Sequence, residues 1–365
     1  MLIAPHSIGS KTPILNRGES PMKVSCLAVA AGLVLAALPA TAQDGPYKIL
    51  KTAKVGGAGG FDYVYADAAG RRLYIPRSGN PGRINVFDLD TLEPAGEIPG
   101  NARGAAVDPK SAHGFATSKP VVMWDAKTLA TVKTIDVQGG PDGILFDPFN
   151  QRVWVFSHSA PNATVLDAKD GSIVGTVDLG GAPEQAVSDG KGHIYVDIED
   201  KDNVAVVDTK TMKVTGNYPL EGKGGTPAGL AMDVKNNILF VACRNPATMV
   251  IMNAADGKII TTLPLGAGTD GAVFNPKTME AFSSQGDGTL TVIKENSPTS
   301  FAVEQTVKTP VRAKTLTLDS KTDHILLITA EFAPPPASAT PPAPGGRGAR
   351  GVMVPDSFSI LVVGK

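Results

Sequence analysis

The chain has 365 residues, a formal net charge of −1, 42% hydrophobic residues and 19% charged residues. The near-zero charge argues against nucleic acid or an anionic membrane surface as the main partner, and the hydrophobic share excludes a disordered chain. The 40 glycines and 29 prolines indicate many tight turns, which disfavours a helical bundle or a coiled coil.

The N-terminal segment has the pattern of an export signal. Met22 and Lys23 form a positively charged start, residues 24–38 are almost entirely apolar, and residues 39–42 have the small-x-small pattern that signal peptidase reads, with cleavage after Ala42. A membrane anchor is the alternative, but the apolar run has about 15 residues, whereas roughly 20 are needed to span a bilayer.

We therefore expect residues 22–42 to be a signal peptide and the mature protein to be periplasmic or secreted. Residues 1–21 are then an upstream extension, and either Met1 or Met22 is the start of the protein. Removal of the signal peptide leaves Cys243 as the only cysteine, which excludes an internal disulfide and a metal site built from cysteines.

The rest of the chain is a repeat. Seven segments share one pattern: a short apolar strand, an Asp or Asn, a few turn residues, and a second apolar strand. Most units add two further strands around another Asp or Asn, and the units recur every 39 to 44 residues. Four short antiparallel strands at this period are typical of a propeller blade. The Asp and Asn residues that anchor the seven turns are Asp67, Asp108, Asp147, Asp189, Asp233, Asn275 and Asp319.

The two ends of the repeat predict how the ring closes. The seventh unit has strands at about 314–318, 324–329 and 357–363 and stops one strand short at Lys365. Residues 47–55 match the last strand of the other units, so we expect them to complete blade seven. The predicted fold class is therefore an all-β, seven-bladed β-propeller with four antiparallel strands per blade.

The predicted propeller domain covers residues 43–365 and has one interruption. Residues 332–355, between the second and third strands of blade seven, are rich in Pro, Ala and Gly. This composition predicts a mobile loop that packs against no core. We interpret it as a neutral insertion in preference to a functional lid.

The repeat resembles the YVTN-repeat, YncE-like family of exported bacterial β-propellers. The resemblance covers about residues 47–365 and is carried by second strands such as Leu73 to Ile75, Ile194 to Val196 and Leu239 to Val241. The literal Tyr-Val-Thr-Asn signature is absent. The resemblance implies the fold and an exported protein, but it implies no particular activity, because a fold alone does not confer chemistry.

Two positions of the repeat predict a binding site. In a propeller, the entry to each innermost strand and the exit of the second strand open on the same face, at the mouth of the central channel. Five residues before each anchor, six of seven positions are charged. The first set is Asp62, Arg103, Asp142, Glu184, Ala228, Asp270 and Lys314, and the second set, at the ends of the second strands, is Arg77, Ser118, His158, Glu199, Arg244, Gln285 and Glu331.

Blades three and four carry the densest group of candidate ligands. Asp142, Glu184 and His158 supply carboxylate oxygens and an imidazole, which suit Ca²⁺, Mg²⁺, Mn²⁺ or Zn²⁺. A divalent ion there could polarise a carbonyl group or a bound water. His158 and Glu199, which lie nearby in the predicted register, are candidate catalytic residues together with Arg103 and Arg244.

The cations of the same face have two interpretations. Arg103 and Arg244 could stabilise an oxyanion, and with Lys314 they could hold an anionic substrate. Alternatively, the charges form a solvated rim, or Arg–carboxylate pairs that hold the blades in register.

Two functions follow from these residues. The first is an exported binding or interaction protein, expected to be monomeric, that holds a small ligand, a metal ion or a protein partner at the channel mouth. The alternative is a metal-assisted hydrolase or lyase, like the lactonases on other propellers. The sequence contains no complete catalytic motif that decides between them.

Overall fold

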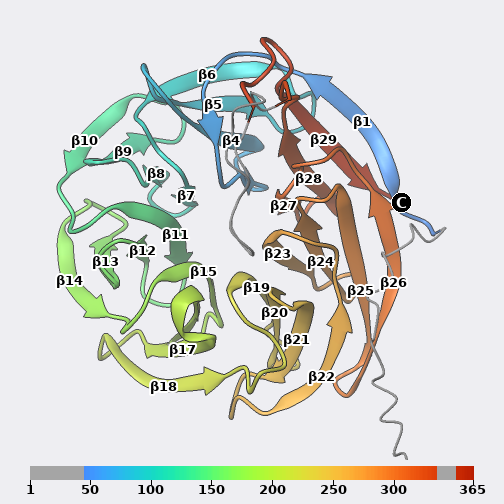
Figure 1. Ribbon diagram of the computed structural model, residues 1–365. Helices are drawn as coiled ribbons and strands as arrows, with labels where there is room; N and C mark the ends of the chain where they lie inside the picture. Colours follow the sequence, from blue (N-terminus) through green and yellow to red (C-terminus); the bar gives the residue numbers. More distant parts are fainter. Residues whose placement is uncertain (1–44, 335–350) are drawn as a thin grey trace, which may run out of the picture. The chain divides into compact units, whose positions relative to one another are not determined.

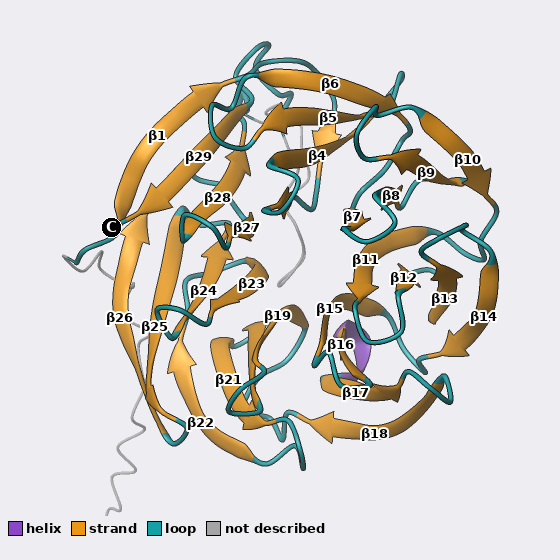
Figure 2. Cartoon of the chain, turned by 180° about the vertical axis from the view of Figure 1, so that it is seen from behind, coloured by secondary structure: helices purple, strands orange, loops and turns teal. Residues whose placement is uncertain are grey.

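The computed structural model describes residues 45–334 and 351–365. These residues form seven antiparallel sheets arranged in a ring, which is a seven-bladed β-propeller (Figures 1 and 2). The predicted fold class is confirmed. The signal peptide expected at residues 22–42 and the upstream extension at 1–21 lie outside the described residues.

The strands follow the predicted four-strand pattern. Blade one contains β2 (Gly60–Phe61), β3 (Tyr65–Asp67), β4 (Arg72–Ser78), β5 (Arg83–Asp88) and β6 (Pro94–Pro99); blade two contains β7 (Ala105–Asp108), β8 (His113–Ala116), β9 (Val121–Asp125) and β10 (Thr131–Ile135). Blade three contains β11 (Pro141–Asp147), β12 (Arg152–Ser157), β13 (Asn162–Asp167) and β14 (Ile173–Asp178); blade four contains β15 (Pro183–Ser188), β16 (His193–Ile198), the short helix η1 (Glu199–Lys201), β17 (Asn203–Asp208) and β18 (Lys213–Pro219). Blade five contains β19 (Pro227–Asp233), β20 (Ile238–Arg244), β21 (Ala247–Asn253) and β22 (Ile259–Pro264); blade six contains β23 (Thr269–Asn275), β24 (Glu280–Gln285), β25 (Thr289–Ser297) and β26 (Ser300–Lys308). Blade seven contains β27 (Thr315–Asp319), β28 (His324–Thr329), β29 (Ser359–Gly364) and, from the other end of the chain, β1 (Lys48–Lys54).

The N-terminal strand closes the ring as predicted. β1 pairs antiparallel with β29, from Lys48 opposite Gly364 to Lys54 opposite Ser359, and Figure 1 shows the blue first strand beside the red last strand. Because β1 is the outer strand of blade seven, residues from both ends of the propeller form one sheet.

Both ends are also fastened to blade six. The backbone N–H of Tyr47 donates to Gln305 Oε1 at 2.9 Å, and Gln305 Nε2 donates to the Tyr47 carbonyl at 2.8 Å. The Tyr47 hydroxyl donates to Glu280, whose other oxygen accepts from Lys365 Nζ at 2.8 Å. Glu280 is fully buried. We call these four residues, Tyr47, Glu280, Gln305 and Lys365, the terminal latch.

The anchor residues turn the chain between the first and second strands. Each of the seven accepts a hydrogen bond from a backbone N–H two or three residues further along; Lys191 N donates to Asp189 at 2.7 Å, and Lys277 N donates to Asn275 at 3.0 Å. An Asp or Asn side chain makes this turn without help from other residues, which explains its recurrence in every unit.

The core consists of layers between neighbouring blades. Trp124 of blade two packs with Tyr74 of blade one, and Trp154 of blade three packs with Ile194 of blade four. All four side chains are fully buried. A blade has two apolar faces, so every blade needs a neighbour on each side. The closed ring gives every blade both neighbours.

The innermost strands approach one another closely beneath the channel mouth. A Cβ atom on Gly229 would lie 2.6 Å from the backbone of Gly271, so glycine is required at this contact between blades five and six. Gln185 of blade four spans the same region: its Nε2 donates to the Ala272 carbonyl at 3.0 Å, and its Oε1 accepts from the N–H groups of Leu230 and Ala272, both at 3.1 Å. This side chain ties three blades together.

The insertion in blade seven is shorter than predicted. Phe332 and Met353 form a β-bridge and pack against the hydrophobic cluster between blades seven and one. The guanidinium of Arg312 lies 4.4 Å from the ring centre of Phe332. The expectation that residues 332–355 pack against no core is therefore wrong at both ends of the segment. Phe332 and Met353 are large apolar residues that gain from burial, whereas the sequence between them is mostly Pro, Ala and Gly. Residues 335–350 lie outside the described part of the chain.

A buried carboxyl group between blades five and six predicts a pH dependence of stability. Burial, together with the nearby charge of Asp233, raises the pKa of Glu295 to about 7, although Asn236 Nδ2 donates to it at 2.8 Å. The folded protein therefore keeps a proton that the unfolded chain releases above its ordinary pKa of 4.5, so stability is lost as the pH rises from about 4.5 to about 7.

Replacing Glu295 by Gln removes this loss. The thermal midpoint of Glu295→Gln, measured relative to that of the wild type, is expected to be higher at pH 8 than at pH 5. Between these two pH values, the unfolding free energy of the variant is expected to gain on that of the wild type by on the order of 2 kcal/mol. Thermal unfolding at the two pH values measures it. If the thermal midpoints of the wild type and of Glu295→Gln change with pH in the same way, Glu295 does not have a raised pKa.

In the part of the chain that the structure describes, no helix has the length and apolar character that crossing a membrane requires.

Candidate functional site

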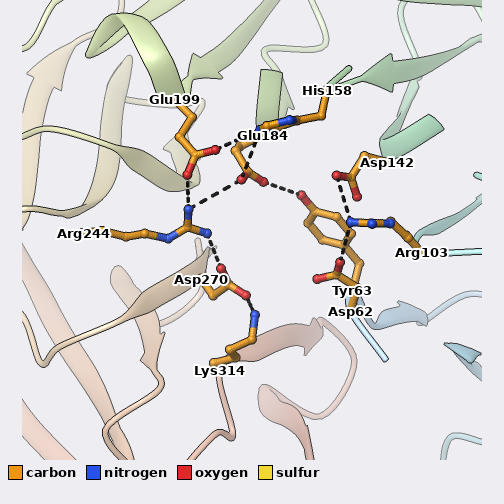
Figure 3. Close-up of a pocket in the computed structure, with 10 residues that line it drawn as sticks. All are labelled: Asp62, Tyr63, Arg103, Asp142, His158, Glu184, Glu199, Arg244, Asp270 and Lys314. Carbon is orange, nitrogen blue, oxygen red and sulfur yellow. Dashed lines mark hydrogen bonds and ion pairs between the residues drawn. The ribbon is translucent and has the colours of Figure 1, made fainter. Parts of the chain in front are cut away.

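A cavity of about 330 Å³ opens at the channel mouth (Figure 3). Every blade contributes at least one side chain to it, and all of these side chains are charged or carry a polar group. Within the described part of the chain, the lining residues are Asp62, Tyr63, Arg103, Asp142, His158, Glu184, Glu199, Arg244, Asp270 and Lys314.

The strand geometry brings these residues together. Asp142, Glu184 and Asp270 are each the second residue of an innermost strand, and in each case the pairing with the second strand shifts register at that point. Such bulges bend a strand and redirect its side chains. His158 and Glu199 directly follow the second strands of the same blades, so they meet these carboxylates at the mouth.

One side of the cavity holds Arg103 between two carboxylates. Its Nη1 lies 3.3 Å from Asp142 Oδ2 and 3.5 Å from Asp62 Oδ2. Asp142 is 9% exposed, and its other oxygen, Oδ1, has no hydrogen-bond partner among the described residues. Burial and the charge of Asp62 raise the pKa of Asp142, against the opposing charge of Arg103. This carboxylate is incompletely compensated.

The centre of the cavity is occupied by Glu184. The Tyr63 hydroxyl donates to Glu184 Oε2 at 3.2 Å, and Glu184 Oε1 lies 3.9 Å from His158 Nε2. Burial, together with the charges of Glu199 and Asp142, raises the pKa of Glu184 to about 7 despite the nearby Arg244. Burial and the charges of Glu184, Asp142 and Asp62 raise the pKa of Tyr63 well above its ordinary value, so the phenol stays a neutral hydrogen-bond donor.

The third part of the cavity is organised by Arg244. Its Nη1 pairs with Glu199 Oε1 and lies 3.6 Å from Glu184 Oε1, while its Nη2 pairs with Asp270, which also pairs with Lys314. Partial burial raises the pKa of Glu199, but the hydrogen bond from His158 and the charge of Arg244 outweigh it, and the net shift is downward. These contacts link blades four to seven, as the alternative of structural Arg–carboxylate pairs predicts.

Three side chains offer ligand atoms for a metal ion. One atom each from His158, Glu184 and Glu199 lies within 4.8 Å of the other two, and His158 Nε2 lies 2.9 Å from Glu199 Oε2. The predicted metal set contained Asp142 in place of Glu199. Asp142 turns toward Arg103 instead, so the structure groups a different carboxylate with His158 and Glu184.

A further carboxyl group lies behind the cavity. Asp197, in β16, is fully buried, and neither of its oxygens has a hydrogen-bond partner in the described residues. Burial and the nearby charge of Glu184 raise its pKa well above the ordinary value. The sequence pattern did not indicate that Asp197 is buried. A polar residue between the apolar residues Val196 and Ile198 is the ordinary alternation of a strand with one face in the core and one in water.

Of the eleven charged or histidine residues in the two predicted sets, nine line the cavity and two lie elsewhere. Arg77 is buried between blades seven and one, where its Nη2 donates to the carbonyls of Gly57 and Gly59 at 3.1 and 3.0 Å and its guanidinium carbon lies 3.7 Å from the ring centre of Phe358. Glu331 is exposed and lies 4.0 Å from Lys54 of the closing strand. Neither side chain lines the cavity, and both make their contacts near the place where the ring closes.

Tyr63 is the lining residue that the sequence prediction missed. It follows Asp62 in the repeat, at a position that holds glycine in four of the other blades, namely Gly104, Gly143, Gly229 and Gly271. A large side chain at a position that is mostly glycine is the signal that would have identified it.

The fold and this cavity define a seven-bladed β-propeller with a polar, acid-rich pocket at its channel mouth. No protein-family model matches the chain, and no curated protein matches it. The arrangement can hold a small positively charged group, because the described residues that line the cavity include five carboxylates and only three permanent cations.

Proposed function

We propose that the protein is an exported, monomeric binding protein that holds a small, positively charged ligand at the mouth of its propeller channel. The observation that carries this proposal is the acidic surplus of one cavity, with a nine-tenths buried carboxylate, Asp142, that lacks a partner for Oδ1 among the described residues. A buried carboxylate oxygen without a hydrogen-bond partner is costly, and a bound cation would supply a partner for Oδ1. The export signal at residues 22–42 and the resemblance to YVTN-repeat propellers are parts of the same proposal.

Thermal shift measurements test the proposal with named probes. Putrescine, spermidine, choline, Ca²⁺, Mn²⁺ and Zn²⁺ are compared with the anions phosphate and citrate. At least one cation is expected to raise the midpoint of the wild type by mass action, and Asp142→Asn is expected to reduce that shift. Glu97→Gln is the matched control, because Glu97 is an exposed carboxylate of the outer strand β6. A shift by the anions alone, or no shift by any cation, would refute the proposal.

The second candidate is a metal-assisted hydrolase or lyase. It is favoured by the close approach of His158, Glu184 and Glu199 in a cavity that has room for a substrate. A metal ion there would polarise a carbonyl or a bound water. The pH-stat hydrolysis of an aromatic lactone, with and without EDTA, distinguishes this enzyme from a binding protein, because only the enzyme turns the lactone over in a chelator-sensitive way.

A further inference from the structure

We infer that His158, Glu184 and Glu199 bind one divalent transition-metal ion, best matched by Zn²⁺. This inference rests on the proposed function, since it names the cation that the acidic cavity takes.

The distances fit a metal ion of this size. Zn²⁺ bonds to imidazole nitrogen and carboxylate oxygen at about 2.0–2.2 Å, so tetrahedral ligands lie about 3.4 Å from one another. His158 Nε2 lies 2.9 Å from Glu199 Oε2 and 3.9 Å from Glu184 Oε1. These two separations lie on either side of the required value, and one ligand atom of each of the three residues lies within 4.8 Å of the other two, so small movements of the side chains would bring them into a metal site.

Each carboxylate has one oxygen held and one oxygen turned to the histidine. Glu184 Oε2 accepts from the Tyr63 hydroxyl at 3.2 Å, while Oε1 lies 3.9 Å from His158 Nε2 and 3.6 Å from Arg244 Nη1. Glu199 Oε1 pairs with Arg244, while Oε2 faces His158. Tyr63 and Arg244 therefore act as positioning residues, which fix the orientation of metal ligands as outer-shell partners do in known sites.

The ligand types select among divalent ions. One imidazole and two carboxylates suit Zn²⁺ or Mn²⁺, whereas Ca²⁺ takes six to eight oxygen ligands and Mg²⁺ needs a near-ideal octahedron. Three protein ligands beside an open cavity leave a coordination position for water or for a substrate group.

The surroundings provide a second, independent reason for a cation. Asp142 lines the same cavity, and its buried Oδ1 has no partner among the described residues. The five carboxylates that line the cavity outnumber the cations Arg103, Arg244 and Lys314, and a doubly charged ion would balance this excess of negative charge.

Isothermal titration of EDTA-treated, dialysed protein with ZnCl₂, MnCl₂ and CaCl₂ tests the inference. The wild type is expected to bind Zn²⁺ at one per chain and more tightly than Ca²⁺. His158→Ala and Glu199→Gln are each expected to weaken Zn²⁺ binding at least tenfold. The thermal midpoint without metal shows whether each variant is folded, and either variant alone suffices if the other does not fold.

His193→Ala is the matched control. His193 also pairs with a carboxylate, since its Nδ1 lies 3.0 Å from Asp189, but the pair lies outside the cavity. Zn²⁺ binding by His193→Ala should equal that of the wild type. The inference is overturned if no ion binds at one per chain, if Ca²⁺ binds as tightly as Zn²⁺, or if the two pocket variants bind Zn²⁺ as well as the control does. If it fails while an amine still shifts the midpoint through Asp142, the proposed function stands without the metal.

Discussion

A chain that begins at Gly56, and therefore lacks β1 and Tyr47, is expected to lose the folded monomer. β1 supplies the fourth strand of blade seven, and Tyr47 joins that blade to Glu280 and Gln305 of blade six. Without them, β29 becomes an unpaired edge, and edges of this kind pair with other chains. The lost ladder hydrogen bonds and apolar burial amount to at least about 5 kcal/mol, which is comparable with the total stability of many proteins.

Size-exclusion chromatography and thermal unfolding measure this outcome. The truncated chain is expected to aggregate or to melt far below the chain that begins at Gln43. Tyr47→Phe serves as the graded control: it removes only the hydroxyl that donates to Glu280, so it should fold and lose about 1 kcal/mol. A truncated chain that elutes and melts like the longer one would show that β1 does not close the ring.

Replacing Arg244 by Gln is expected to cost about 3 kcal/mol of unfolding free energy, the range found when one partner of a buried ion pair is removed. The Arg244 side chain is 17% exposed and pairs with Glu199 and Asp270, which are 20% and 10% exposed. Without the guanidinium of Arg244, the carboxylates Glu199 and Asp270, and Glu184 beside them, lose the positive charge that offsets their mutual repulsion. Blades four, five and six would lose this shared ion-pair contact and keep the one that Gln185 provides.

Arg103→Gln is the matched control, because it removes the same charge from the opposite side of the same cavity. The Arg103 side chain is 56% exposed, and its two carboxylate partners lie at 3.3 and 3.5 Å. Because water already solvates the Arg103 guanidinium, its pairs are expected to contribute only about 1 kcal/mol, although Asp142 is buried. Urea unfolding of both variants measures the difference. If both variants lose the same small amount, the charges form a solvated rim and the structural interpretation of Arg244 is wrong.

Most of the architecture followed from the repeat. Turn-forming Asp and Asn side chains act locally, so their positions in the sequence reveal where each blade begins, and the register they set also located nine of the cavity residues. The unmatched strand at the N-terminus and the missing strand at the C-terminus predicted the closure, because each strand of a blade needs hydrogen-bond partners along its length.

The two residues that were predicted to line the cavity but lie elsewhere show where the repeat positions no longer predict the location of a side chain. Arg77 and Glu331 belong to blades one and seven, which flank the closure. In blade one the innermost strand is divided into β2 and β3, and in blade seven the chain leaves β28 for the insertion. Their second strands therefore end in surroundings that the other five blades do not share.

The grouping of side chains within the cavity was decided by tertiary structure alone. Sequence spacing placed Asp142, Glu184, His158 and Glu199 at one mouth, but it could not show that Asp142 turns to Arg103 while Glu199 turns to His158. That choice depends on which oppositely charged group each carboxylate reaches across a blade boundary. Asp197 was likewise found only in the fold, because burial and missing hydrogen-bond partners are properties of the packed ring and not of any one repeat.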